Sequence, residues 1–90
     1  EAGLSQDELE TTMYELSYGL EAARGGDMQT VRETAADGID ATYYSDWLLT
    51  VASYEASRFH DDVEEARSLA SEIGTEWWAD WALSEADAHE

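Results

Sequence analysis

Residues 41–59, ATYYSDWLLTVASYEASRF, carry the densest apolar pattern in the chain and decide its fold. Apolar side chains recur there at steps of three and four residues, which gathers them on one side of an α-helix. They are Tyr44, Trp47, Leu48, Val51, Ala52 and Phe59, and Glu55 falls on the same side. This stripe predicts a central core helix that ends near Arg58, with Glu55 at the edge of the stripe and its carboxylate in water.

The rest of the chain predicts four more helices, each bounded by local start and stop signals. Ser5 and Glu8 have the spacing of a capping box, and Gly25-Gly26 supplies the left-handed conformation that ends the first helix. The other boundaries are Asp27 and Asp37-Gly38 for the second helix, Asp40 or Thr42 for the start of the central one, His60-Asp61 and Gly74 for the fourth, and Thr75 for the last.

These signals predict an all-α protein of about five short antiparallel helices. We expect one domain over residues 1–90, with a first hairpin at 5–39, a second hairpin at 40–74 and a terminal Trp-rich helix at 75–88. The expected inner faces are Leu9, Met13, Leu16, Leu20 and Ala23 in the first helix, Met28, Val31, Ala35 and Ile39 in the second, and Val63, Ala66, Leu69, Ala70 and Ile73 in the fourth.

A shift of 34 residues lays the first hairpin over the second and matches helix with helix. Six identical pairs result when Glu21, Ala22, Arg24, Asp27, Ala36 and Ile39 are placed over Glu55, Ala56, Arg58, Asp61, Ala70 and Ile73. This period is that of tetratricopeptide repeats, and residues 47–73, with Trp47 and Tyr54 in the first helix, resemble such a hairpin, although the closing proline is missing. The resemblance implies stacked hairpins with a concave groove, whereas the alternative is an ordinary small helical bundle.

The charge balance is strongly acidic, with 22 Asp and Glu against four Arg, no Lys and a formal net charge of -18. Such a charge opposes compaction in dilute buffer, but the Debye length falls to about 3 Å at 1 M salt. The Lys-free acidic composition resembles that of proteins from salt-in haloarchaea. The resemblance implies a cytoplasmic protein that works in molar salt, with K⁺ or Mg²⁺ held loosely at its acidic surface.

Composition also argues against several function classes. Four scattered arginines form no basic stripe, so we expect no nucleic-acid binding, and no apolar run approaches the roughly 20 residues of a membrane span. The chain has no Cys or Lys and only two His, and none of its serines lies in a nucleophile elbow. We therefore expect neither an enzyme nor a cofactor. The start at Glu1 is compatible with a processed chain or a part of a longer polypeptide.

The cluster His60, Asp61, Glu64 and Glu65 is the candidate for a metal site, because imidazole and carboxylates are suitable ligands. His60 with Glu64, and Asp61 with Glu65, are four residues apart and share a helical face. However, the segment matches neither a calcium-loop nor an HExxH motif. The simpler interpretation is a solvated helix start at which acidic residues interact favourably with the helix dipole.

The aromatic residues give the leading functional hypothesis. Trp77 and Trp78 diverge by about 100° on a helix, so Trp77, Trp78 and Trp81 cannot all point into one core. Tyr43 and Tyr44 pose the same question, and exposed aromatic rings are frequent anchors at protein interfaces. We expect Trp77, Trp78, Trp81, Tyr43 and Tyr44 to form a surface that binds another protein or a second copy of the chain.

Two alternatives come from other function classes. The first is a carboxylate and histidine metal-binding bundle, or a small accessory subunit of an enzyme. The second is an acidic mimic of nucleic acid that binds a basic partner. A third, structural interpretation of the aromatic residues is that a small domain uses large side chains to fill its core.

Overall fold

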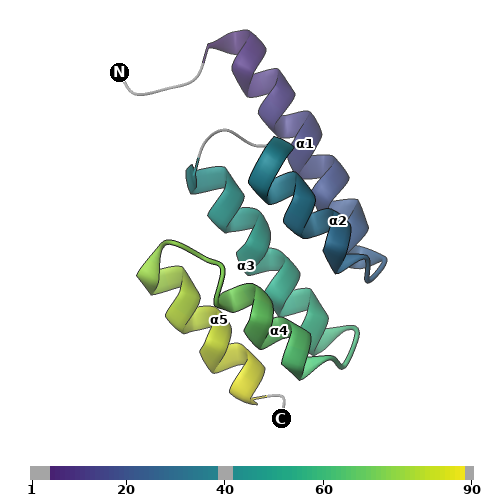
Figure 1. Ribbon diagram of the computed structural model, residues 1–90, viewed down its shortest axis with the longest axis vertical. Helices are drawn as coiled ribbons and strands as arrows, with labels where there is room; N and C mark the ends of the chain where they lie inside the picture. The colour runs from purple at the N-terminus through teal and green to yellow at the C-terminus, as the bar shows by residue number, and fades with distance from the viewer. Residues whose placement is uncertain (1–4, 39–41, 89–90) are drawn as a thin grey trace.

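The computed structural model describes residues 5–38 and 42–88, and it consists of five α-helices (Figure 1). They are α1 (Gln6–Arg24), α2 (Met28–Glu33), α3 (Thr42–Arg58), α4 (Val63–Ala70) and α5 (Glu76–Ala88), and a π-helical turn, η1 (Thr34–Gly38), continues α2. No strand occurs in the described ranges. The prediction of an all-α fold with five helices is therefore confirmed. None of the described helices is both long enough and apolar enough to cross a membrane.

The central helix α3 joins the two halves of the molecule. α1 packs along one side of α3 and α5 along the other, so that the three helices lie side by side (Figure 1). α2 packs on α1 and α3, and α4 packs on α3 and α5. The helices thus form two layers, α1, α3 and α5 in one and α2 and α4 in the other, and α3 contacts every other helix.

The predicted start of α1 is confirmed in atomic detail. The Ser5 hydroxyl accepts a hydrogen bond from the Glu8 backbone N–H at 3.2 Å, and the Glu8 carboxylate accepts one from the Ser5 N–H at 2.9 Å. After α1, Gly25 is still right-handed, and Gly26, at φ +85°, makes the left-handed turn. The helix boundaries that depend on local backbone groups were thus readable from the sequence.

Asp27 caps α2 as predicted. Its carboxylate accepts hydrogen bonds from the Thr30 hydroxyl at 2.7 Å and from the Thr30 N–H at 3.2 Å, and these bonds lower the pKa of Asp27. In the second hairpin Asp62 caps α4, and its carboxylate accepts a hydrogen bond from the Glu65 backbone N–H. The residue before it, Asp61, has the left-handed conformation at φ 56°. The second turn is therefore one residue longer than the first, and the residue equivalent to Asp27 is Asp62 rather than Asp61.

Among the other predicted boundaries, the end of α4 is wrong, the start of α5 is correct, and one lies partly outside the described residues. α4 ends at Ala70 instead of continuing to Gly74, although Ile73 is still buried. α5 begins at Glu76, directly after Thr75 as predicted, but the Thr75 hydroxyl donates a hydrogen bond to Asp46 in α3 instead of capping the helix. Ile39 and Asp40 lie outside the described residues, as does the side chain of Thr42.

The core lies where the first hairpin meets the second. Leu48 in α3 is fully buried against Gly19 in α1, where a Cβ atom would approach Leu48 Cδ2 to 2.6 Å. Glycine at position 19 thus lets α1 come close to α3. Leu48 belongs to one cluster of buried apolar residues, whose other members are Ala23, Met28, Val31, Ala35, Leu49, Ala52, Ala56, Ala66, Leu69, Ala70, Ile73, Ala82 and Ala86.

The predicted stripe of the central helix is only partly the core. Leu48 and Ala52 are fully buried, but Trp47 is 37% exposed and Phe59 is 66% exposed, so their assignment to the core is wrong. Phe59 follows the last residue of α3, where the helical spacing no longer places it. Leu9 and Met13 of α1 are also exposed, because the first turns of α1 extend beyond the start of α3 (Figure 1).

Two polar contacts between helices were not predicted. Asp46 of α3 is buried, and its carboxylate accepts three hydrogen bonds from the turn before α5: from Gly74 N–H at 3.1 Å, Thr75 N–H at 2.9 Å and the Thr75 hydroxyl at 2.7 Å. Arg32 of α2 pairs with Glu65 of α4 at 2.7 Å and with Glu72, which follows the end of α4. The first contact fixes the start of α5 on α3, and the second ties the two hairpins together.

Candidate functional site

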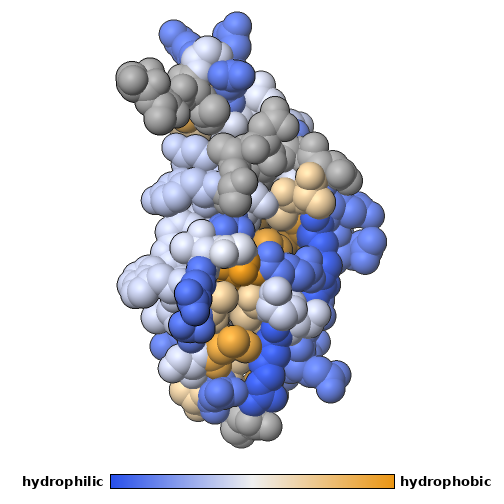
Figure 2. Space-filling model, turned by 60° about the vertical axis from the view of Figure 1, so that its left-hand side comes forward, coloured by the Kyte–Doolittle hydropathy of each residue, from blue (hydrophilic) through white to orange (hydrophobic). Residues whose placement is uncertain are grey.

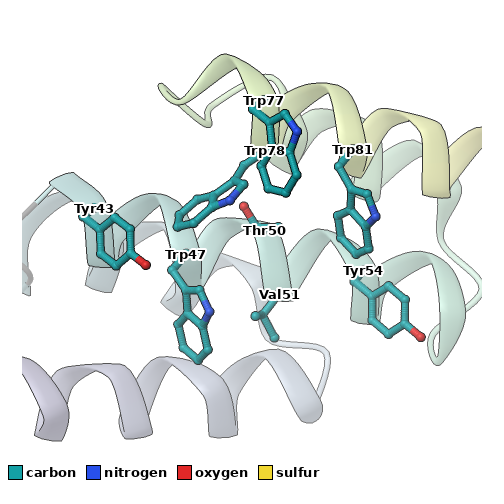
Figure 3. Close-up of a pocket in the computed structure, with 8 residues that line it drawn as sticks. All are labelled: Tyr43, Trp47, Thr50, Val51, Tyr54, Trp77, Trp78 and Trp81. Atoms are coloured by element: carbon teal, nitrogen blue, oxygen red, sulfur yellow. The ribbon is translucent and has the colours of Figure 1, made fainter.

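A groove of about 550 Å³ lies between α3 and α5 (Figure 3). Its lining residues, which we call the aromatic groove, are Tyr43, Trp47, Thr50, Val51 and Tyr54 from α3 and Trp77, Trp78 and Trp81 from α5. The chain has four tryptophans, and all of them line this groove.

On the α3 side, the groove is built from a second stripe of the same helix. Trp47 follows Tyr43 by four residues and Tyr54 follows Trp47 by seven, so these rings share one face. At 100° per residue, Trp47 and the buried Leu49 project about 160° apart. α3 therefore presents Leu48, Leu49 and Ala52 to the core, and most of its aromatic side chains, together with Val51, line the groove on another face of the helix.

On the α5 side, the same division separates alanine from tryptophan. Ala82 and Ala86 are buried, whereas Trp77 is 71% exposed and Trp81 is 41% exposed. Trp78 lines the groove and also packs against the core. Small residues thus let α5 pack closely on its neighbours, and the large tryptophan rings line the groove.

Ring contacts join the two walls. The Tyr43 and Trp78 centroids are 5.1 Å apart, and Tyr54 and Trp81 lie nearly parallel with centroids 5.8 Å apart. Trp47 has no such contact within the described residues, and Figure 3 shows it pointing away from α5. The walls are therefore braced by two ring pairs.

Four of the five predicted surface residues meet in this groove: Trp77, Trp78, Trp81 and Tyr43. Tyr44 does not line it but is half-buried against the core, with its ring edge-on to Tyr43 at 5.2 Å. Trp47, Thr50, Val51 and Tyr54 were missed as groove residues. The sequence did contain a signal for them. Positions 43, 47, 50 and 54 are three or four residues apart, so their side chains form a second stripe beside the core stripe on the same helix.

The charges near the groove are mostly acidic. Arg58 is the cation at one end, with its guanidinium 5.1 Å from the Tyr54 ring centroid and 3.7 Å from the Glu85 carboxylate. Glu76 and Asp80 are exposed and directly precede Trp77 and Trp81. Figure 2, which brings the α5 side forward, shows apolar and intermediate residues beside strongly hydrophilic ones.

The predicted metal cluster does not converge. His60 Nε2 lies 2.9 Å from the Ala23 carbonyl oxygen, so the imidazole links the second turn to α1. Glu65 pairs with Arg32, Asp61 occupies the left-handed turn position, and Glu64 is exposed. In the two described ranges, no three His, Cys, Asp or Glu side chains are grouped so that they could hold a metal ion. His60 and Asp61 therefore serve the turn, Glu65 serves the contact between the hairpins, and Glu64 is exposed.

Comparisons with protein families, with characterised proteins and with solved structures find no match to this chain. Its function is therefore inferred from the aromatic groove itself.

Proposed function

We propose that the protein is a binding module that holds a segment of another protein in its aromatic groove. The observation that carries this proposal is the exposure of the groove's rings: Trp77 is 71% exposed, Tyr43 62% and Trp81 41%. Large aromatic side chains concentrate binding energy at protein interfaces. The function is association, with no chemical step.

The energetics favour a role for these rings outside folding. Full burial of one large apolar side chain contributes about 1.5–3 kcal/mol to folding stability. Trp77 is 71% exposed, so its ring contributes only a small part of this to folding. The core needs small residues where α5 packs, because Ala82 and Ala86 fill that contact. Filling the core of a small domain therefore does not account for the position of Trp77.

Charge distinguishes the two kinds of partner that the groove could accept. Each copy of the chain carries a formal charge of -18, so two copies repel each other at long range in dilute buffer and, in molar salt, wherever their carboxylates come within about 3 Å. A different protein without this excess of acid avoids that repulsion. We therefore propose a heterologous partner, with self-association as the competing outcome of the test below.

We also propose that the module works in the salt-rich cytoplasm of a haloarchaeon-like cell, with K⁺ or Mg²⁺ loosely associated with its carboxylates. The support is the absence of lysine and the excess of 22 acidic residues over four arginines. Helicity measured by circular dichroism should rise as KCl is raised from millimolar to molar, because screening weakens the self-repulsion. Full helicity in dilute buffer would contradict this part of the proposal.

The order of the helices supports a stack of two related hairpins similar to tetratricopeptide repeats. α1 and α3 end at Arg24 and Arg58, 34 residues apart, and each is followed by a left-handed residue and an aspartate cap. The groove lies on α3 and α5, in the layer that holds the first helix of each hairpin and the terminal helix. We propose that the α3 and α5 part of this layer is the binding face.

The test compares an aromatic residue inside the groove with one outside it. A partner is first identified by cross-linking in molar KCl, and its affinity is then measured for the wild type, Trp77→Ala and Tyr14→Ala. Tyr14 is 70% exposed on α1 and lines a hollow away from the groove. We expect Trp77→Ala to weaken binding by about 2 kcal/mol, or roughly thirtyfold, and Tyr14→Ala to change it little.

Equal affinities of the two variants for the purified partner would refute the proposal. Sedimentation of the wild type alone, over a range of concentrations in molar KCl, provides the second readout. If the chain dimerises and Trp77→Ala abolishes the dimer, the groove is a self-association surface and the heterologous partner is wrong.

A further inference from the structure

We infer that the partner segment carries arginine, and that the groove binds it by stacking the guanidinium group on the exposed tryptophan rings. This inference rests on the proposed function, since it names the chemistry of the segment that the groove accepts.

The chain already contains one example of the contact. The Arg58 guanidinium lies over the Tyr54 ring, 5.1 Å from its centroid, at one end of the groove. Trp81 stacks on the same Tyr54 ring at an interplanar angle of 20°. A cation over the face of an aromatic ring is attracted by the negative charge density of that face.

Two tryptophans have ring faces that no other aromatic ring covers. Within residues 5–38 and 42–88, neither Trp47 nor Trp77 takes part in a ring contact, and neither indole N–H has a hydrogen-bond partner. Trp77 is the most exposed of the four tryptophans, and Figure 3 shows its position on α5. A planar cation can therefore stack on these rings without displacing an existing ring contact.

The charge of the chain favours a cation in this position. Three of its four arginines are already paired with acidic side chains: Arg32 with Glu65 and Glu72, Arg58 with Glu85, and Arg67 with Asp87. Glu76 and Asp80 remain exposed next to the groove tryptophans. The surroundings of the groove are thus negative, and an acidic or neutral segment gains nothing from them.

Arginine fits these rings better than lysine does. Its guanidinium is planar and weakly hydrated, so it stacks on aromatic faces, whereas the lysine ammonium is compact and strongly hydrated. Attraction over long distances is screened in molar salt, but contact between a cation and a ring occurs within about 6 Å. Stacking can therefore operate where long-range steering cannot.

The first experiment uses end-blocked peptides in which leucine alternates with arginine, lysine or citrulline. Citrulline keeps the planar shape of arginine and removes its charge. Binding in molar KCl is followed by tryptophan fluorescence, which reports on the groove because all four tryptophans line it. We expect the arginine peptide to bind about tenfold more tightly than the citrulline peptide, with the lysine peptide between them.

The second experiment separates stacking from general attraction to an acidic protein. In Trp77→Ala and Trp77→Leu, the preference for arginine over citrulline should fall to about twofold or less, because leucine restores apolar area but no aromatic face. Tyr14→Ala, which removes an exposed ring from α1, should keep the full preference. Circular dichroism confirms that each variant is folded.

Three results would overturn the inference: no binding of the arginine peptide, equal binding of the arginine and citrulline peptides, or an arginine preference that both Trp77 variants retain. Each is distinguishable from failure of the proposed function. If Trp77→Ala weakens the natural complex while citrulline binds as well as arginine, the groove is a docking site that recognises apolar groups only.

Discussion

In the first hairpin the chain passes from α1 to α2 through Gly26 at φ +85°, and in the second it passes from α3 to α4 through Asp61 at φ 56°. Both residues are left-handed, and an aspartate that caps the next helix follows each of them. Residues 25–27 separate the first pair of helices, whereas residues 59–62 separate the second. The two turns therefore share their backbone geometry, although they differ in the type of the left-handed residue and in length.

The hairpins also differ in how they are attached. The first hairpin contacts the rest of the molecule on one side, where Gly19 receives Leu48 and Arg32 reaches α4. The second is held on both sides, since Asp46 of α3 also binds the turn before α5. We therefore expect substitutions in the second hairpin to have the larger effects on folding.

The largest effect is expected for Leu48→Ala. Leu48 is fully buried between the hairpins, so its truncation should lower the free energy of unfolding by about 3 kcal/mol, through lost burial and the cavity left behind. Urea denaturation in molar KCl measures this change. The matched control is Leu9→Ala in the first hairpin, which removes the same atoms from a side chain that is 40% exposed and should cost less than about 1 kcal/mol. Equal losses would mean that burial of Leu48 at the contact between the hairpins does not stabilise the fold.

A smaller decrease in the free energy of unfolding, of about 2 kcal/mol, is expected for Asp46→Ala. The substitution leaves Gly74 N–H, Thr75 N–H and the Thr75 hydroxyl without their buried acceptor. Asp80→Ala, on the exposed side of α5, removes the same charge and serves as the control. If both variants unfold at the same urea concentration, the hydrogen bonds of Asp46 do not hold the turn.

The smallest effects on stability are expected from substitutions of the two left-handed residues, Gly26 and Asp61. Gly26→Ala should destabilise the protein by about 1 kcal/mol, because a Cβ is unfavourable at positive φ. Asp61→Gly should stabilise it by about 0.5 kcal/mol, since relief of the same strain outweighs the greater freedom of the unfolded chain. Thermal unfolding of both variants measures the pair. Changes of the same sign would show that the turns are not equivalent.

The helices were predictable from the sequence because their ends depend on local groups. The capping box of Ser5 and Glu8 involves residues three positions apart, and Asp27 caps α2 through Thr30. The face that each helix buries was less predictable. In α3 the core stripe and the aromatic stripe lie side by side in the sequence, and only the position of α5 shows that Trp47 belongs to the groove.

The sequence predicted most of the α5 side of the groove, but not the buried contact that holds its two walls together. Trp77, Trp78, Trp81 and Tyr43 were expected at a surface because one core cannot accept so many rings. The burial of Asp46 could not be predicted, because an aspartate in a chain with 22 acidic residues is expected at the surface. Its burial follows from the distant turn at Gly74 and Thr75, which the local pattern around Asp46 does not contain.

The hydrogen bonds of Asp46 have a consequence for the rate at which the groove is filled. They fix the start of α5 on α3 only two residues before Trp77, so the spacing of the two walls is set before any partner arrives. A preorganised site loses little conformational entropy on binding. Association should therefore proceed in a single kinetic phase whose observed rate rises linearly with partner concentration, without a plateau from a slow opening step.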